Sequence, residues 1–177
     1  MRVMVGAQTI LALALCACSG VDASKYDHVK GPAFGDDESG DDFRPVSSVI
    51  ERRCGTLDCH GSEARPLRIY SQFGLRKHID KNPDAGQYFP GGLDATTPDE
   101  LLDNYRSMIG LEPEKLDLVV AKKAKVETLT LVRKPRLAEK HKGGLVWNKG
   151  DDGDVCLVNW LTGVADTSTC TAELMHP

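Results

Sequence analysis

Two cysteines and a histidine stand close together early in the chain. Four residues separate Cys54 from Cys59, and His60 follows the second cysteine directly. This arrangement is typical of covalent haem attachment, in which two sulfurs bond to the porphyrin and the imidazole binds the iron. The usual spacing is Cys-x-x-Cys-His. Positions five apart on a helix lie about 140° from each other, so the segment between these cysteines must leave the helical conformation.

The same residues allow two other interpretations. Outside the cytoplasm, Cys54 and Cys59 can form a local disulfide, although such a bond does not explain the adjacent His60. A zinc site needs about four ligands, and no second pair of cysteines has the spacing of zinc ligands. A disulfide that only closes a turn would make the protein a haem-free binding or structural module.

The first residues are typical of an exported lipoprotein. Arg2 is followed by an apolar stretch of about 15 residues, which is too short to cross a bilayer as a helix. Leu15, Ala17 and Cys18 resemble the site at which bacterial lipoproteins are cleaved and acylated. This resemblance implies that residues 1–17 are a signal peptide and that acyl chains on Cys18 enter a lipid bilayer. Ser19 resembles the signal that sorts lipoproteins to the outer membrane, whereas a plain secretory peptide cut nearby is the alternative.

An acidic segment follows the signal. Residues 19–43 hold seven acids and two bases, and their few apolar side chains cannot offset the conformational entropy lost on folding. We therefore predict a disordered acidic tether over residues 18–43 and one folded domain over residues 44–177. The net charge of −4 provides no overall basic field for a nucleic acid partner.

The folded domain is predicted to be mainly α-helical, with long loops between short helices. Thr97, Pro98 and Glu100 form the pattern of a capping box. Asp154 is expected to cap a later helix, which Gly163 ends. The patterns of apolar residues predict helices over 45–54, 97–110, 114–124, 154–163 and 167–174.

Two parts of the chain resemble the cytochrome c-like domains of bacterial envelope lipoproteins. The first surrounds Cys54, Cys59 and His60, since Cys-x4-Cys-His is a variant of the attachment motif in such domains. The second is residues 129–163, where a histidine is followed by glycines, an acidic loop and a helix that bears Trp160. The resemblance implies a cytochrome c-like fold, with haem between the helix before Cys54 and the helix of Trp160. The chain departs from this pattern in its wide cysteine spacing and an insert near residues 64–97.

If His60 binds the iron from one side, the ligand on the other side determines what the site does. We favour His141, because Gly143 and Gly144 allow the backbone to approach a flat ring closely, and Met108 is the alternative. Two histidines give a lower reduction potential than a histidine and a methionine. The weaker candidates for the iron are His78, Met175 and His176, and those for contacts with the propionates or the ring are Arg68, Tyr70, Phe73 and Arg76.

Cys156 and Cys170 are predicted to form a structural disulfide in an oxidising compartment. The cysteine motif and the resemblance predict a monohaem cytochrome with covalent haem c, whereas this disulfide is also compatible with the haem-free module. We expect the cytochrome to be tethered to the outer membrane, to face the periplasm, and to pass single electrons to a redox partner protein in the envelope. No nucleophile–base set supports an enzyme. Besides the haem-free module, an iron site with one open face, for ligand sensing or peroxidase-like activity, remains an alternative.

Overall fold

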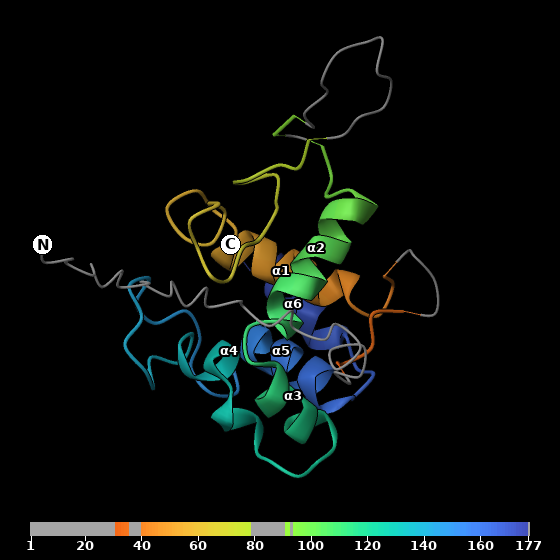
Figure 1. The fold of residues 1–177 in the computed structure, drawn as a ribbon, viewed down its shortest axis with the longest axis vertical. Coiled ribbons are helices and arrows are strands. Elements are labelled where there is room, and N and C mark those ends of the chain that lie inside the picture. The colour runs from red at the N-terminus through yellow and green to blue at the C-terminus, as the bar shows by residue number, and fades with distance from the viewer. Residues whose placement is uncertain (1–30, 36–39, 79–90, 93, 177) are drawn as a thin grey trace, which may run out of the picture.

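The computed structural model describes residues 31–35, 40–78, 91–92 and 94–176, and the predicted signal peptide and Cys18 lie outside them. This part of the chain is mainly α-helical, as predicted, and its only β-type pairing is an isolated bridge between Tyr70 and Leu75. None of its helices has the length and apolar character needed to cross a membrane. The elements are α1 (Arg44–Cys54), α2 (Pro98–Ile109), α3 (Pro113–Val120), the 3-10 helix η2 (Val126–Thr128), α4 (Thr130–Arg133), α5 (Asp152–Thr162) and α6 (Ser168–Met175) (Figure 1).

Helix α5 lies at the centre of the bundle and packs against α1, α3, α4 and α6 (Figure 1). Its buried residues Leu157, Trp160 and Leu161 recur at helical spacing and face the core. Helix α1 contributes Val46 and Val49, each 1% exposed, and its last residue is Cys54. The packing of α1 against α5 and α6 therefore fixes the position from which the cysteine motif begins.

Helix α2 begins and ends as its sequence predicts. The Thr97 hydroxyl accepts a hydrogen bond from the Glu100 backbone N–H, and the Glu100 carboxylate accepts one from the Thr97 N–H, which completes the capping box. The helix ends before Gly110.

Other helix boundaries differ from the prediction. Helix α3 stops at Val120 rather than residue 124, because the chain turns at Lys122, whose φ is 58°. The prediction that Asp154 caps α5 was wrong: the helix begins two residues earlier, with Asp151 at the N-cap position. The Asp154 side chain, 3% exposed, instead accepts hydrogen bonds from Arg136 and from the Gly150 N–H. Helices η2 and α4 were not predicted.

A disulfide joins Cys156 of α5 to Cys170 of α6, which confirms the predicted pair. Both cysteines are 1% exposed, and the bond closes a loop of about 15 residues. In the chain-entropy model such a loop stabilises the fold by about 3 kcal/mol.

Residues 31–35, which the sequence analysis placed in the tether, lie against the folded helices. The Trp160 Nε1–H donates to the Ala33 carbonyl oxygen at 2.8 Å, and the Tyr105 hydroxyl donates to the Pro32 carbonyl oxygen at 2.8 Å. The ring of Phe34 lies 5.0 Å from that of Tyr105, between centroids. This short segment is therefore part of the packed domain.

Candidate functional site

The cysteine motif forms one compact turn at the end of α1. The His60 N–H donates to the Cys54 carbonyl oxygen at 2.8 Å, and the Cys59 N–H donates to that of Thr56 at 3.0 Å. Cys54 and Cys59 are free thiols, so the local disulfide considered from the sequence is not formed. Burial and the neighbouring Cys59 raise the pKa of the Cys54 thiol to about 12. In the chain by itself this thiol is therefore protonated at neutral pH.

Two glycines allow the turn to close. A Cβ atom on Gly61 would lie 2.2 Å from the Gly55 carbonyl oxygen, and one on Gly74 would lie 2.1 Å from the same atom. Any larger residue at either position would push the loops apart. The Gly55 oxygen also accepts a hydrogen bond from the Ser71 hydroxyl at 2.7 Å, so three segments meet at this carbonyl.

The imidazole of His60 is held in one tautomer. Its Nδ1 lies 2.9 Å from the Leu67 carbonyl oxygen. A carbonyl oxygen can only accept, so Nδ1 carries the hydrogen and Nε2 carries the lone pair. Burial lowers the pKa of His60, the bond to Leu67 acts in the opposite direction, and His141 lowers it further. The ring is therefore neutral at neutral pH, which is the form that binds a metal.

His141 repeats this arrangement on the loop between α4 and α5. Its Nδ1 lies 2.9 Å from the Gly144 carbonyl oxygen, so its lone pair also lies on Nε2. Gly144 has a φ of 74°, a conformation that favours glycine. A Cβ atom on Gly143 would lie 3.0 Å from Cε1 of the His141 ring. Both glycines of this loop thus allow the backbone to fold closely around the ring.

The two imidazoles lie together. Their ring centroids are 6.3 Å apart and their planes are 14° from parallel. Neither Nε2 has a hydrogen-bond partner within the described part of the chain. An imidazole nitrogen binds a transition metal at about 2 Å and the ring centre lies about 1 Å further, so two rings on opposite sides of one ion have centres about 6 Å apart. His60 and His141 therefore have a separation and tautomers that suit two ligands of one metal ion.

The surrounding donors indicate which kind of metal centre this pair suits. The described residues contain no group of three or more histidines, cysteines and carboxylates that could hold a bare ion. A structural zinc site needs about four protein ligands, whereas haem iron takes its equatorial ligands from the porphyrin and needs only axial ones. Two nearly parallel imidazoles and the two free thiols of the motif are compatible with a haem that is attached covalently.

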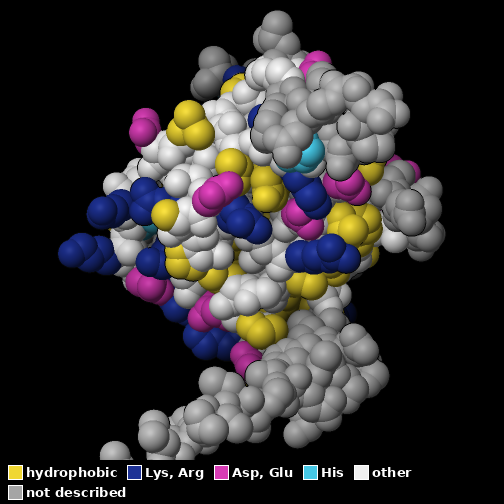
Figure 2. Space-filling view, turned by 45° about the horizontal axis from the view of Figure 1, so that its top comes forward, with side chains coloured by type: hydrophobic (Ala, Val, Ile, Leu, Met, Phe, Trp, Pro, Cys, Tyr) yellow, Lys and Arg dark blue, Asp and Glu magenta, His cyan; other side chains and the backbone are white. Residues whose placement is uncertain are grey.

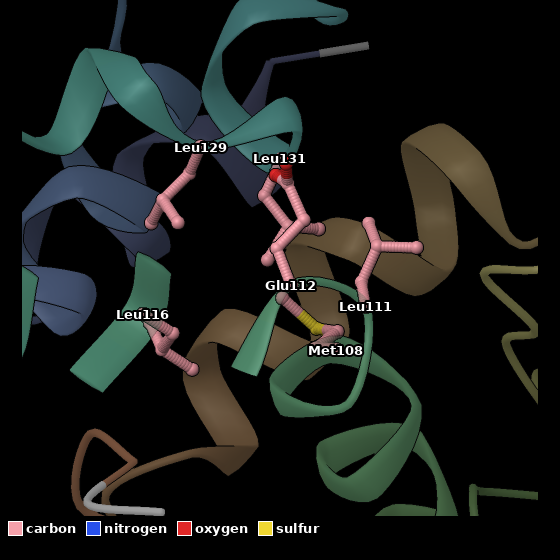
Figure 3. Close-up of a pocket in the computed structure, with 6 residues that line it drawn as sticks. All are labelled: Met108, Leu111, Glu112, Leu116, Leu129 and Leu131. Atoms are coloured by element: carbon pink, nitrogen blue, oxygen red, sulfur yellow. The ribbon is translucent and has the colours of Figure 1, made fainter. Parts of the chain in front are cut away.

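Met108, the alternative iron ligand, lies in the core. Its side chain is 1% exposed and lines a small, mostly apolar cavity of about 10 Å³. Figure 3 shows it among leucines of the loop after α2, of α3 and of the η2–α4 region, and neither imidazole lines this cavity. A cavity of this size holds about one water molecule at most. These surroundings are those of a methionine that fills space between helices.

The candidates for haem contacts occupy different surroundings. Arg68 is exposed, and its guanidinium lies 5.4 Å from the centre of the Tyr70 ring. Arg76 makes five hydrogen bonds, two to Glu100 and three to backbone carbonyls, so every N–H of its guanidinium is occupied. Phe73 is 46% exposed. Arg76 therefore stabilises the start of α2 and has no hydrogen left for a propionate.

The remaining histidine and methionine candidates lie elsewhere. Met175 is 77% exposed at the end of α6. The neighbouring His176 is also exposed, with its Nε2 3.9 Å from Asp152. His78 is half-buried in the segment that follows Arg76.

Sequence reasoning missed the residues that hold the motif in shape. Arg65 donates from Nε to the Cys59 carbonyl oxygen at 3.0 Å and from its terminal nitrogen to that of Asp58 at 3.2 Å. The carbonyls of Leu67 and Gly144 orient the two imidazoles. In the sequence, the role of Arg65 is indicated only by its position six residues after Cys59. No sequence signal identifies the backbone carbonyls that orient the imidazoles.

Comparisons with protein-family models, with curated proteins and with solved structures found no match to this chain.

Proposed function

We propose that this protein is a c-type cytochrome with one haem, which carries single electrons in the cell envelope. Cys54 and Cys59 would hold the haem through thioether bonds, and His60 and His141 would bind its iron. The observation that carries the proposal is the pair of nearly parallel imidazoles, 6.3 Å apart between ring centroids, each with Nδ1 bonded to a carbonyl.

When bound, haem supplies an iron that takes up and releases one electron. The chain's own residues keep the ligands in place while this happens. The carbonyls of Leu67 and Gly144 fix the orientation of both rings, and partners of this kind also raise the basicity of a ligand. Ligands that are already oriented need little rearrangement between oxidation states, which suits electron transfer.

Two features support this role over the alternatives. The His141 ring, 6.3 Å from that of His60 between centroids, would supply a second protein ligand to the iron, which favours electron transfer over an iron with one open face for ligand sensing or peroxidase-like activity. The haem-free module requires a bond between Cys54 and Cys59 that closes the turn, and both are free thiols. We also propose the export signal and the acyl anchor on Cys18 as the means that tether the cytochrome to the outer membrane.

Production of the full chain with the haem-attachment machinery tests the proposal. We expect a pyridine haemochrome spectrum of haem c, and haem that stays on the protein in a denaturing gel. Cys54→Ser with Cys59→Ser should abolish this signal, whereas Cys156→Ser with Cys170→Ser is the matched control, because it removes the same number of thiols away from the motif. Protein without a Soret band after denaturing purification would refute the cytochrome.

A further inference from the structure

A buried carboxylate joins the two segments that carry the candidate site. On the face that Figure 2 draws, acidic side chains lie at the surface among basic ones, where ion pairs add little to stability because water screens them. Glu173 of α6 differs, since it is only 6% exposed. A carboxylate is costly to bury unless hydrogen-bond donors surround it, and the donors that bind Glu173 lead to both imidazoles.

Glu173 binds two side chains through one carboxylate oxygen. Its Oε1 accepts a hydrogen bond from Nε of Arg53 at 2.6 Å and another from Nε1 of Trp147 at 3.1 Å. Arg53 belongs to α1, and Trp147 belongs to the loop between α4 and α5. Three segments that are far apart in the sequence therefore meet at this atom.

The Arg53 side of this contact leads to His60. Arg53 directly precedes Cys54, whose carbonyl oxygen accepts a hydrogen bond from the His60 N–H at 2.8 Å. The neighbouring Arg52 donates to the Leu174 carbonyl oxygen at 2.8 Å, so α6 binds the last turn of α1 at two points. The start of the cysteine motif is therefore held against α6.

The Trp147 side leads to His141. Trp147 is 3% exposed, and a Cβ atom on Gly153 would lie 2.3 Å from its Nε1, so the indole lies directly against the first turn of α5. Three residues before Trp147, the Gly144 carbonyl oxygen accepts a hydrogen bond from Nδ1 of His141 at 2.9 Å. The position of the indole therefore limits where the His141 ring can lie.

The disulfide keeps Glu173 in place. Cys170 lies three residues before it, on the same face of α6, and the bond to Cys156 joins that face to α5. The carboxylate is therefore presented from a helix that is covalently fixed to the centre of the bundle.

We propose that Glu173 is a positioning residue for the candidate site. By binding Arg53 and Trp147 with one oxygen, it holds the segments of the two imidazoles at the separation at which both rings can bind one iron. The inference rests on the proposed function, because a fixed separation matters only when one ion takes both His60 and His141. It assigns to α6, which supplies neither ring, a part in keeping His141 bound.

The full chain without haem provides the first test. Glu173→Leu removes the acceptor, whereas Glu173→Gln keeps an acceptor oxygen for both donors. In nuclear magnetic resonance spectra of the imidazole nitrogens, we expect the Nδ1–H tautomer of His60 and His141 in the native chain and in Glu173→Gln. Glu173→Leu should show mixed tautomers in at least one ring, with faster hydrogen exchange at the Val146 amide. Native tautomers in Glu173→Leu would overturn the proposal. Trp147→Phe removes only the donor on the side of His141, and it gives the answer for that ring if Glu173→Leu does not fold.

The chain that carries haem provides the second test. Free imidazole competes with His141 for the iron, so a loosely held His141 gives tighter binding of the competitor. We expect the dissociation constant of imidazole to fall at least about tenfold in Glu173→Leu and to change little in Glu173→Gln. Phe34→Ala, which loses packing against Tyr105, is the control for stability alone and should leave the constant unchanged.

The two tests separate the positioning role from the proposed function. Equal effects of Glu173→Leu and Phe34→Ala on imidazole binding would overturn the positioning role. A native chain without a Soret band would instead refute the cytochrome, and the tautomers of the haem-free chain would still show whether Glu173 positions the rings.

Discussion

Arg136 and Asp154 form a buried two-point ion pair that ties the His141 loop to α5. The distances are 2.6 Å from Nε to Oδ1 and 2.9 Å from the terminal nitrogen to Oδ2, and the side chains are 10% and 4% exposed. The neighbouring Pro135 carbonyl oxygen accepts a hydrogen bond from the Val146 N–H at 2.8 Å. The Arg136 end of the loop that carries His141 is thereby bound to α5, and the Val146 end is bound to the Arg136 end.

Removal of one partner from this pair should loosen the loop. Arg136→Ala leaves the Asp154 carboxylate buried without its cation, which typically lowers the free energy of unfolding by about 3–5 kcal/mol. We expect Arg136→Lys to lose less, because it keeps the charge and gives up only the two-point geometry. Urea unfolding at neutral pH measures both. An Arg136→Ala protein as stable as the native one would contradict the assigned role of the pair.

The proposed role of His141 as the second iron ligand is tested by absorption and electron paramagnetic resonance spectra. His141→Ala should keep covalent haem but convert a low-spin ferric spectrum to a high-spin one, because one strong axial donor is lost. Met108→Leu is the matched control, since it replaces a buried apolar side chain of similar volume away from the imidazoles, and its spectrum should be unchanged. A low-spin His141→Ala protein whose spectrum changes on Met108→Leu would transfer the role to Met108.

Some of the fold follows from local sequence signals, and the rest depends on distant partners. The Thr97–Glu100 capping box and the Gly163 helix end were predicted because each is made by residues a few positions apart. The boundary of α5 was not, because Asp154 resembles a helix cap until its partner Arg136, 18 residues earlier, is known. The predicted tether wrongly included residues 31–35. Trp160 and Tyr105 bind backbone carbonyls of this segment, and every residue type has such a carbonyl, so the sequence does not reveal the contact.

The candidate site, too, could be predicted only in part from the sequence. The types and spacing of Cys54, Cys59 and His60 indicated a haem site, and two glycines indicated His141. The sequence could not predict that both Nε2 atoms would be left as acceptors, because the carbonyls of Leu67 and Gly144 determine the tautomers through the loop conformation.

Glu51 should make stability depend on pH. Burial raises the pKa of this carboxyl, hydrogen bonds from Ser47 and Thr96 oppose the rise, and Glu100 adds to it. A carboxyl whose pKa is higher in the folded chain than in the unfolded chain favours the folded state most at low pH. Its contribution to the free energy of unfolding is fully present below the ordinary pKa of 4.5 and is lost as the pH rises through the folded pKa. Glu51→Gln does not ionise, so its free energy of unfolding should improve relative to the native protein between pH 4 and pH 7.

Glu100 provides a control of opposite sign. Burial alone would raise the pKa of its carboxyl, but Arg76 and the N–H groups of Thr97 and Lys77 outweigh it and lower the pKa. Its contribution to stability is present above the ordinary value and is lost as the pH falls through the folded one. Glu100→Gln should therefore lose more stability at pH 7 than at pH 4. The same pH trend in both variants would contradict these assignments.

The docked segment before α1 should stabilise the domain through Phe34. Its half-buried ring contacts Tyr105 and lies 6.1 Å from Phe43, between centroids. Phe34→Ala removes part of this apolar contact, and we expect a loss of about 1–2 kcal/mol in the free energy of unfolding, less than for a fully buried phenylalanine. Phe73→Ala makes the same change at a side chain that is 46% exposed, so it should change stability by about 0.5 kcal/mol or less. Thermal or urea unfolding of the two variants side by side gives the comparison. Equal losses would mean that the Phe34 ring contributes no more to stability than an exposed ring does, which would contradict its role in holding this segment.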